Sequence, residues 1–210
     1  MNPDIEPRWD SSALITIDLQ QDFLSDGAFG VPGTTEVLPV VRTLIQAFRD
    51  AGRPIIHAVR LYLADGSNAD ISRRQSIRAG ASIVRPGTPG AELAPDLLPA
   101  PVPLDAGSLL RGELQPAGDA EHILFKPRWS AFYATPLDAW LRSKSVDTVV
   151  VVGCNYPNCP RGTLFGASER DYRAVAVSDA TSRWTASAAE ELAGIGIVVA
   201  DSRFVVAALR

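Results

Sequence analysis

The chain has 210 residues, of which 46% are apolar and 21% are charged, proportions typical of a globular domain. Its net charge of −4 comes from interspersed acids and bases, which argues against a nucleic-acid partner. No apolar run is long enough for a membrane span, the polar start MNPDIEPRWDSS is unlike a signal peptide, and two cysteines do not make a disulfide framework. We therefore expect one cytoplasmic domain over 1–210, with 1–12 as an N-terminal extension and no membrane partner.

Short apolar runs alternate with helical patterns along the chain. The run ALITI (13–17) predicts a buried strand that ends at Asp18, and a helical pattern begins at Thr35 and is closed by Gly52. Further strands are expected at 54–59, 122–125, 148–153, 174–177 and 197–200, and further helices at 136–143, 160–172 and 185–195. Strands separated by helices indicate βαβ units, and hence an α/β fold with a parallel sheet and helices on both faces.

Residues 61–120 break this alternation. The segment is rich in proline and glycine, and its one helical pattern lies at about 72–79. A connection of this length in a compact domain usually shapes a binding site or an oligomer contact. We expect it to be an insertion within the single domain.

Both cysteines lie in the stretch VVGCNYPNCPRGT (151–163). A structural zinc site needs four ligands, typically in CxxC pairs, whereas the chain offers two cysteines, two histidines and a C-x4-C spacing. A thioredoxin-like redox pair also needs CxxC at the start of a helix. Neither interpretation fits this stretch.

One of the two thiols is placed to be a nucleophile. Pro160 is favoured in a first helical turn, so Cys159 is expected at the N-cap, where the helix dipole lowers a thiol pKa and free N–H groups can hold an oxyanion. Cys154 follows a buried strand directly and is expected to be a small core residue. The competing interpretation of Cys159 is an inert buried thiol.

Three chemically complementary groups follow strands at their carboxyl ends, where sites form in open parallel sheets: Asp18, Lys126 and Cys159. Asp18 would take the thiol proton and pass it to a leaving amine, and Lys126 would stabilise the anions. His57 lies in the middle of a strand and His122 at the start of one, so both are expected to be structural. The alternative for Asp18 and Lys126 is an ion pair without chemistry.

Four motifs in order resemble the isochorismatase-like cysteine hydrolases, a family that includes nicotinamidases and other amidases. They are ITIDLQQDF (15–23), FKPRWSAF (125–132), VVVVGCNYPNCPRGTLFGASERDY (149–172) and VSDATS (177–182). The resemblance covers about 13–200 and implies a three-layer α/β/α fold whose six parallel strands have the order 3-2-1-4-5-6. It also implies a homodimer or a larger homo-oligomer.

The same resemblance implies roles for individual residues. Asp18, Lys126 and Cys159 would form a catalytic triad that works through a thioester. A cis peptide bond would join Cys154 to Asn155 and turn the Asn155 N–H toward the oxyanion, beside the N–H of Cys159. Phe23 and Tyr133 would be at positions that line the pocket in relatives.

The sequence departs from the nicotinamidase pattern at the metal site. In HAVRLYLADGSNAD, which starts at His57, no second histidine follows, so we expect neither a metal nor another cofactor. With Cys159 present, the sequence favours hydrolysis of a C–N bond in a small amide or ureido compound. The alternatives are a vinyl-ether hydrolase that uses Asp18, and a non-catalytic binding protein on the same scaffold.

Aromatic residues around the three motifs suggest a small, flat or partly apolar substrate. Besides Phe23 and Tyr133, these are Trp129 and Tyr156, although an aromatic residue taken singly more often packs in the core than contacts a substrate. An arginine near the strand ends could bind a substrate carboxylate. The candidates are Arg60, Arg128 and Arg161.

Overall fold

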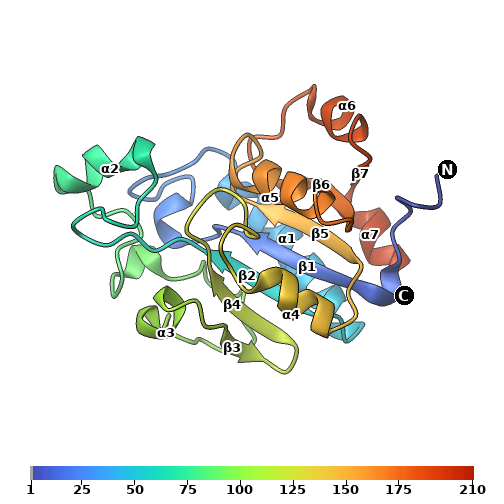
Figure 1. Cartoon of the computed structure of the whole chain (residues 1–210), viewed down its shortest axis with the longest axis horizontal. Helices are drawn as coiled ribbons and strands as arrows, with labels where there is room; N and C mark the ends of the chain where they lie inside the picture. Colours follow the sequence, from blue (N-terminus) through green and yellow to red (C-terminus); the bar gives the residue numbers. More distant parts are fainter. Residues whose placement is uncertain (1) are drawn as a thin grey trace.

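The computed structural model describes residues 2–210 and consists of one central sheet between two layers of helices (Figure 1). The strands are β1 (Ser12–Ile17), β2 (Ile55–Val59), β3 (Gln115–Gly118), β4 (Glu121–Phe125), β5 (Thr148–Gly153), β6 (Arg173–Thr181) and β7 (Val198–Ala200). The helices are α1 (Thr34–Asp50), α2 (Ile71–Arg78), α3 (Ala106–Leu110), α4 (Leu137–Ser143), α5 (Cys159–Ser168), α6 (Ala188–Ala193) and α7 (Ser202–Ala208). Three short 3-10 turns are η1 (Trp9–Ser11), η2 (Gln21–Phe23) and η3 (Pro89–Ala91).

The sheet has the order β3-β4-β2-β1-β5-β6-β7. Its six parallel strands follow the predicted order 3-2-1-4-5-6, which confirms the expected α/β fold. The seventh strand, β3, corrects the expected count: it pairs antiparallel with β4 at the edge of the sheet. Pro116 lies within β3, and an edge strand tolerates a residue that has no N–H to donate.

Both faces of the sheet are covered, so the central strands are apolar along their whole length. All six residues of β1 are buried, and they alternate between two hydrophobic clusters because side chains of a strand point to opposite faces. Leu14 packs with residues of α1, α3 and α7, whereas Ala13, Ile15 and Ile17 pack with residues of α4, α5 and α6.

The segment 61–120 joins the α1 side of this core through buried residues such as Ile83, Leu97 and Leu109. Its helix α2 lies outside the sheet, at the far left of Figure 1. Among residues 2–210, no helix has the length and apolar character that crossing a membrane requires.

Candidate active site

The three candidate groups meet where the strand order reverses. Asp18 follows β1, Lys126 follows β4, and Cys159 begins α5 after β5. β1 lies between β2 and β5, and a crevice at the carboxyl end of such a switch point is where ligands bind in open α/β sheets. The topology therefore brings these groups, which are far apart in sequence, to one place.

Asp18 and Lys126 form a buried ion pair. Lys126 Nζ donates to Asp18 Oδ2 at 2.8 Å, and a second, longer contact of 3.4 Å runs to the carbonyl oxygen of Arg128. The other carboxylate oxygen, Oδ1 of Asp18, is buried and has no hydrogen-bond partner. The pair therefore leaves one acceptor oxygen of Asp18 available at the site.

Cys159 lies in the first turn of α5, which corrects its expected position by one residue. The N-cap is Asn158, and Cys159 is the first helical residue, followed by Pro160. The helix approaches the loop after Lys126 closely: the Ala131 N–H donates to Oγ1 of Thr163 at 3.0 Å. This contact fixes the start of α5 relative to the Lys126 loop.

The turn between β5 and α5 supplies backbone donors beside the thiol. The Cys154–Asn155 peptide bond is cis, as the resemblance implied. Among the described residues, the backbone N–H groups of Asn155 and Cys159 have no acceptor. They are free to bind an oxyanion, the role that the sequence predicted for them.

The thiol of Cys159 is not held as a thiolate. Burial raises the pKa of Cys159, the charge of Asp18 raises it further, and Lys126 and Arg60 oppose this effect only in part. The expectation of a lowered thiol pKa at the helix start was wrong, because it considered neither burial nor the adjacent carboxylate. Burial and the charge of Asp18 thus both favour the protonated thiol, and Asp18 is the adjacent proton acceptor.

Arg60 brings a second cation to Cys159. Its side chain is only 2% exposed, Nη1 donates to Asp70 Oδ2 at 2.9 Å, and Nη2 lies 3.8 Å from Cys159 Sγ. Burial alone would lower the pKa of Arg60, but the acidic groups of Tyr62, Asp18, Cys159 and Asp70 outweigh burial and raise the pKa. The guanidinium therefore remains charged beside the sulfur.

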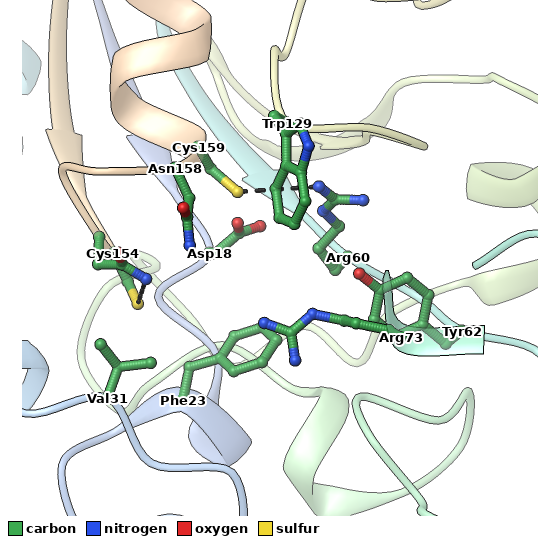
Figure 2. Close-up of a pocket in the computed structure, with 11 residues that line it drawn as sticks. Asp18, Phe23, Val31, Arg60, Tyr62, Arg73, Trp129, Cys154, Asn158 and Cys159 are labelled. Carbon is green, nitrogen blue, oxygen red and sulfur yellow. Dashed lines mark hydrogen bonds between the residues drawn. The ribbon is translucent and has the colours of Figure 1, made fainter. Parts of the chain in front are cut away.

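A small pocket opens over these groups (Figure 2). Its lining includes Asp18, Cys159, Phe23, Arg60 and Trp129, so two of the predicted aromatic residues and one predicted arginine are present. The lining also contains residues that the sequence analysis did not single out for the site: Val31, Tyr62, Arg73, Cys154 and Asn158, together with the predicted Asn155.

Two predicted aromatic residues lie elsewhere, which corrects the expected pocket. Tyr133 is 58% exposed and is not part of the lining. Tyr156 is buried in the core on the α5 side, where its ring lies 4.7 Å from that of Trp184. Cys154, expected in the core, is buried there but also borders the pocket, and burial raises its pKa to about 11.

The two other candidate arginines are occupied outside the pocket. Arg128 donates to the carbonyl oxygens of Pro127 and Asn68, and Arg161 forms a 3.2 Å ion pair with Glu191. Neither is part of the pocket lining.

Neither histidine lines the pocket, and both make structural contacts, as the sequence predicted. His57 is fully buried and bridges Thr16 and Glu121 at 2.9 and 2.7 Å. His122 packs against Trp140 at the other end of its strand, with ring centroids 5.2 Å apart.

The residues after β2 do not suit a metal ion. Of the two acidic residues there, Asp65 is exposed, and Oδ2 of Asp70 accepts hydrogen bonds from Arg60 and from the Tyr62 hydroxyl at 2.9 and 2.6 Å. Within residues 2–210, no three His, Cys, Asp or Glu side chains gather as metal ligands would. A guanidinium and a phenol are not ligands for a divalent cation, so this region does not fit the metal site of nicotinamidases.

The missed residues Tyr62, Asp70 and Arg73 all come from the segment 61–120. The sequence does carry one signal nearby, a short helical pattern with several arginines at about 72–79, which follows the strand at 54–59 after a loop. The spacing does not show which arginine faces the site, because this depends on how Asp70 anchors the helix.

Known proteins resemble both the sequence and the fold. Residues 12–202 match the family model described as the isochorismatase domain. A protein from Arabidopsis thaliana, named a probable inactive nicotinamidase, is 32% identical over 181 residues, which are 85% of this chain and 84% of the relative. Ureidoacrylate amidohydrolase RutB of Methylobacterium radiotolerans is 29% identical over 187 residues, covering 80% of this chain and 66% of that protein.

Among solved structures, an isochorismatase family protein from Desulfovibrio vulgaris superposes with a TM-score of 0.78 and 36% identity, covering 92% of this chain and 95% of that one. The sequence match extends over nearly the whole sheet and includes all three groups at its carboxyl edge. The chain is therefore a hydrolase that belongs to the isochorismatase family.

Proposed function

We propose that this protein is a metal-independent cysteine hydrolase that cleaves a C–N bond of a small amide or ureido compound. The observation that carries the proposal is the convergence of a thiol, a carboxylate with a free oxygen and two cations at one small pocket. The name of the RutB relative, a ureidoacrylate amidohydrolase, supports the same class of reaction.

In the proposed first half-reaction, Oδ1 of Asp18 takes the proton of Cys159, and the sulfur attacks the substrate carbonyl carbon. The N–H groups of Asn155 and Cys159 donate hydrogen bonds to the developing oxyanion. Asp18 then gives its proton to the nitrogen as the C–N bond breaks, which releases ammonia or an amine and leaves an acyl or carbamoyl thioester on Cys159.

In the second half-reaction, a water molecule loses a proton to Asp18 and attacks the thioester carbon. The C–S bond breaks, and Cys159 regains its proton from Asp18. Lys126 holds the carboxylate in place in both halves, and Arg60 stabilises negative charge as it develops on the sulfur.

Two alternatives predict different results for Cys159. Hydrolysis of a vinyl ether would use Asp18 alone, so it would persist when Cys159 is replaced by serine. A non-catalytic scaffold is suggested by the Arabidopsis relative, which is named as probably inactive. This second alternative predicts no turnover of any compound and no adduct on Cys159.

The test is ammonia release from a panel of nicotinamide, butyramide, succinamate, propylurea and 3-ureidopropanoate. Cys159→Ala should lower the rate on any active compound by roughly 10³-fold or more, as removal of a nucleophile does. Cys154→Ala is the matched control, since it removes the other thiol of the same pocket and should retain turnover. Release that survives in Cys159→Ala would refute the nucleophile assignment.

A further inference from the structure

Arg73 is the cation in the pocket without a protein partner. It lines the pocket beside Phe23 and Tyr62, and Figure 2 shows its guanidinium end pointing into the space below Asp18 and Cys159. Within the described part of the chain, Arg73 makes neither a side-chain hydrogen bond nor an ion pair. It is therefore free to bind a ligand.

The other two cations at the site are already neutralised by ion pairs with carboxylates. Lys126 is paired with Asp18, and Arg60 is paired with Asp70. Arg60 also donates from Nη1 to the carbonyl oxygen of Pro127 at 3.0 Å and directs Nη2 at the sulfur of Cys159. Few of its N–H donors are therefore available to a substrate. The site thus has three cations and two carboxylates, which leaves one positive charge at Arg73.

The start of α2 explains why Arg73 faces the site. Asp70 is the N-cap of this helix, and its side chain is held by Arg60 and Tyr62. Arg73 comes three residues later, so it lies on the same side of the helix, one turn further on. The backbone N–H of Arg73 also donates to the carbonyl oxygen of Asp70 at 2.9 Å. The buried ion pair at Asp70 therefore directs Arg73 into the pocket.

We propose that Arg73 binds a carboxylate of the substrate, so that the site selects small amides or ureido compounds that carry an acid group at the end remote from the scissile bond. This inference rests on the proposed function, and it adds the substrate class. With the carbonyl carbon at Cys159, the far end of a substrate would pass Phe23 and reach Arg73, because all three residues line the same pocket. An arginine fork binds a carboxylate through two parallel hydrogen bonds.

The binding test does not require turnover. Calorimetry with Cys159→Ala compares 3-ureidopropanoate with propylurea, and succinamate with butyramide, since each pair differs by a carboxylate in place of a methyl group. We expect each acid to bind at least tenfold more tightly than its neutral partner. Adding Arg73→Gln should remove this difference, and adding Arg73→Lys should restore part of it.

The matched control is Arg78→Gln, which makes the same charge change on an exposed residue of the same helix, outside the pocket. It should leave the preference for acids intact. Equal binding of acid and neutral partner, no binding of either, or a preference that survives Arg73→Gln would overturn the inference. Binding that follows this pattern without ammonia release by the unmutated protein would instead contradict the proposed hydrolysis and leave the role of Arg73 standing.

Discussion

Lys126 donates from Nζ to Oδ2 of Asp18 at 2.8 Å, and both side chains are almost completely shielded from solvent, at 0% and 5% exposure. Replacing Lys126 by methionine would leave the carboxylate buried without its counter-charge. Breaking a buried pair in this way costs about 3–5 kcal/mol of stability. We expect a loss of that size in urea unfolding.

The double variant Asp18→Asn/Lys126→Met serves as the control for this prediction, because it removes both charges. It should unfold at a higher urea concentration than Lys126→Met alone, since an unpaired buried charge is then no longer present. If the single and double variants have equal stability, the pair is not coupled as the 2.8 Å distance implies.

The carboxylate of Asp18 should also set the acidity of the nucleophile. Because the negative charge of Asp18 adds to burial in raising the pKa of Cys159, Asp18→Asn should lower that pKa, since only burial then opposes Lys126 and Arg60. In a Cys154→Ala background, the rate of iodoacetamide alkylation should reach its half-maximum at a lower pH. Ammonia release should fall in the same variant, because its proton acceptor is lost. An unchanged or higher alkylation midpoint would contradict this relationship.

Arg60 acts on the thiol in the opposite direction. Its charge lowers the pKa of Cys159, so Arg60→Gln should move the alkylation midpoint to higher pH in the same Cys154→Ala background. Arg161→Gln is the control, because Arg161 also lies near the start of α5 but pairs with Glu191 outside the pocket. A shift of the same size in both variants would show that the effect of Arg60 is not local.

The sheet and the groups at its carboxyl edge could be predicted because each depends on local sequence signals. The run TVVVVG and the glycine and proline residues around it determine where β5 ends and α5 begins. The parallel order then places Asp18, Lys126 and Cys159 at one edge. Such inferences need periodicity, capping and the rule for sites in parallel sheets, whereas the strand order itself came from the family resemblance.

The remainder of the site depends on contacts within the segment 61–120, which has no regular periodicity. The pairing of Arg60 with Asp70 joins a strand end to a helix start across a loop, and the position of Arg73 follows from it. The raised pKa of Cys159 likewise depends on burial and on the proximity of Asp18, which residue spacing does not determine. The position of Tyr156 could not be predicted for the same reason, because its burial against Trp184 is a tertiary contact.

The close approach of β5 to β1 should make Gly153 irreplaceable. Its φ is +118°, and a Cβ there would overlap the backbone of Ile17, the residue just before Asp18. Gly153→Ala adds a disfavoured backbone conformation to a steric clash, so we expect a loss of about 3 kcal/mol or more in urea unfolding.

Gly112→Ala is the control: Gly112 also has a positive φ, of +85°, but a Cβ there would meet no atom within 4 Å. Gly112→Ala should lower the free energy of unfolding by about 1 kcal/mol, from backbone strain alone. Equal losses in the two variants would mean that the backbone near Asp18 yields to the added methyl group, and that the edge of the sheet is less rigid than its geometry implies.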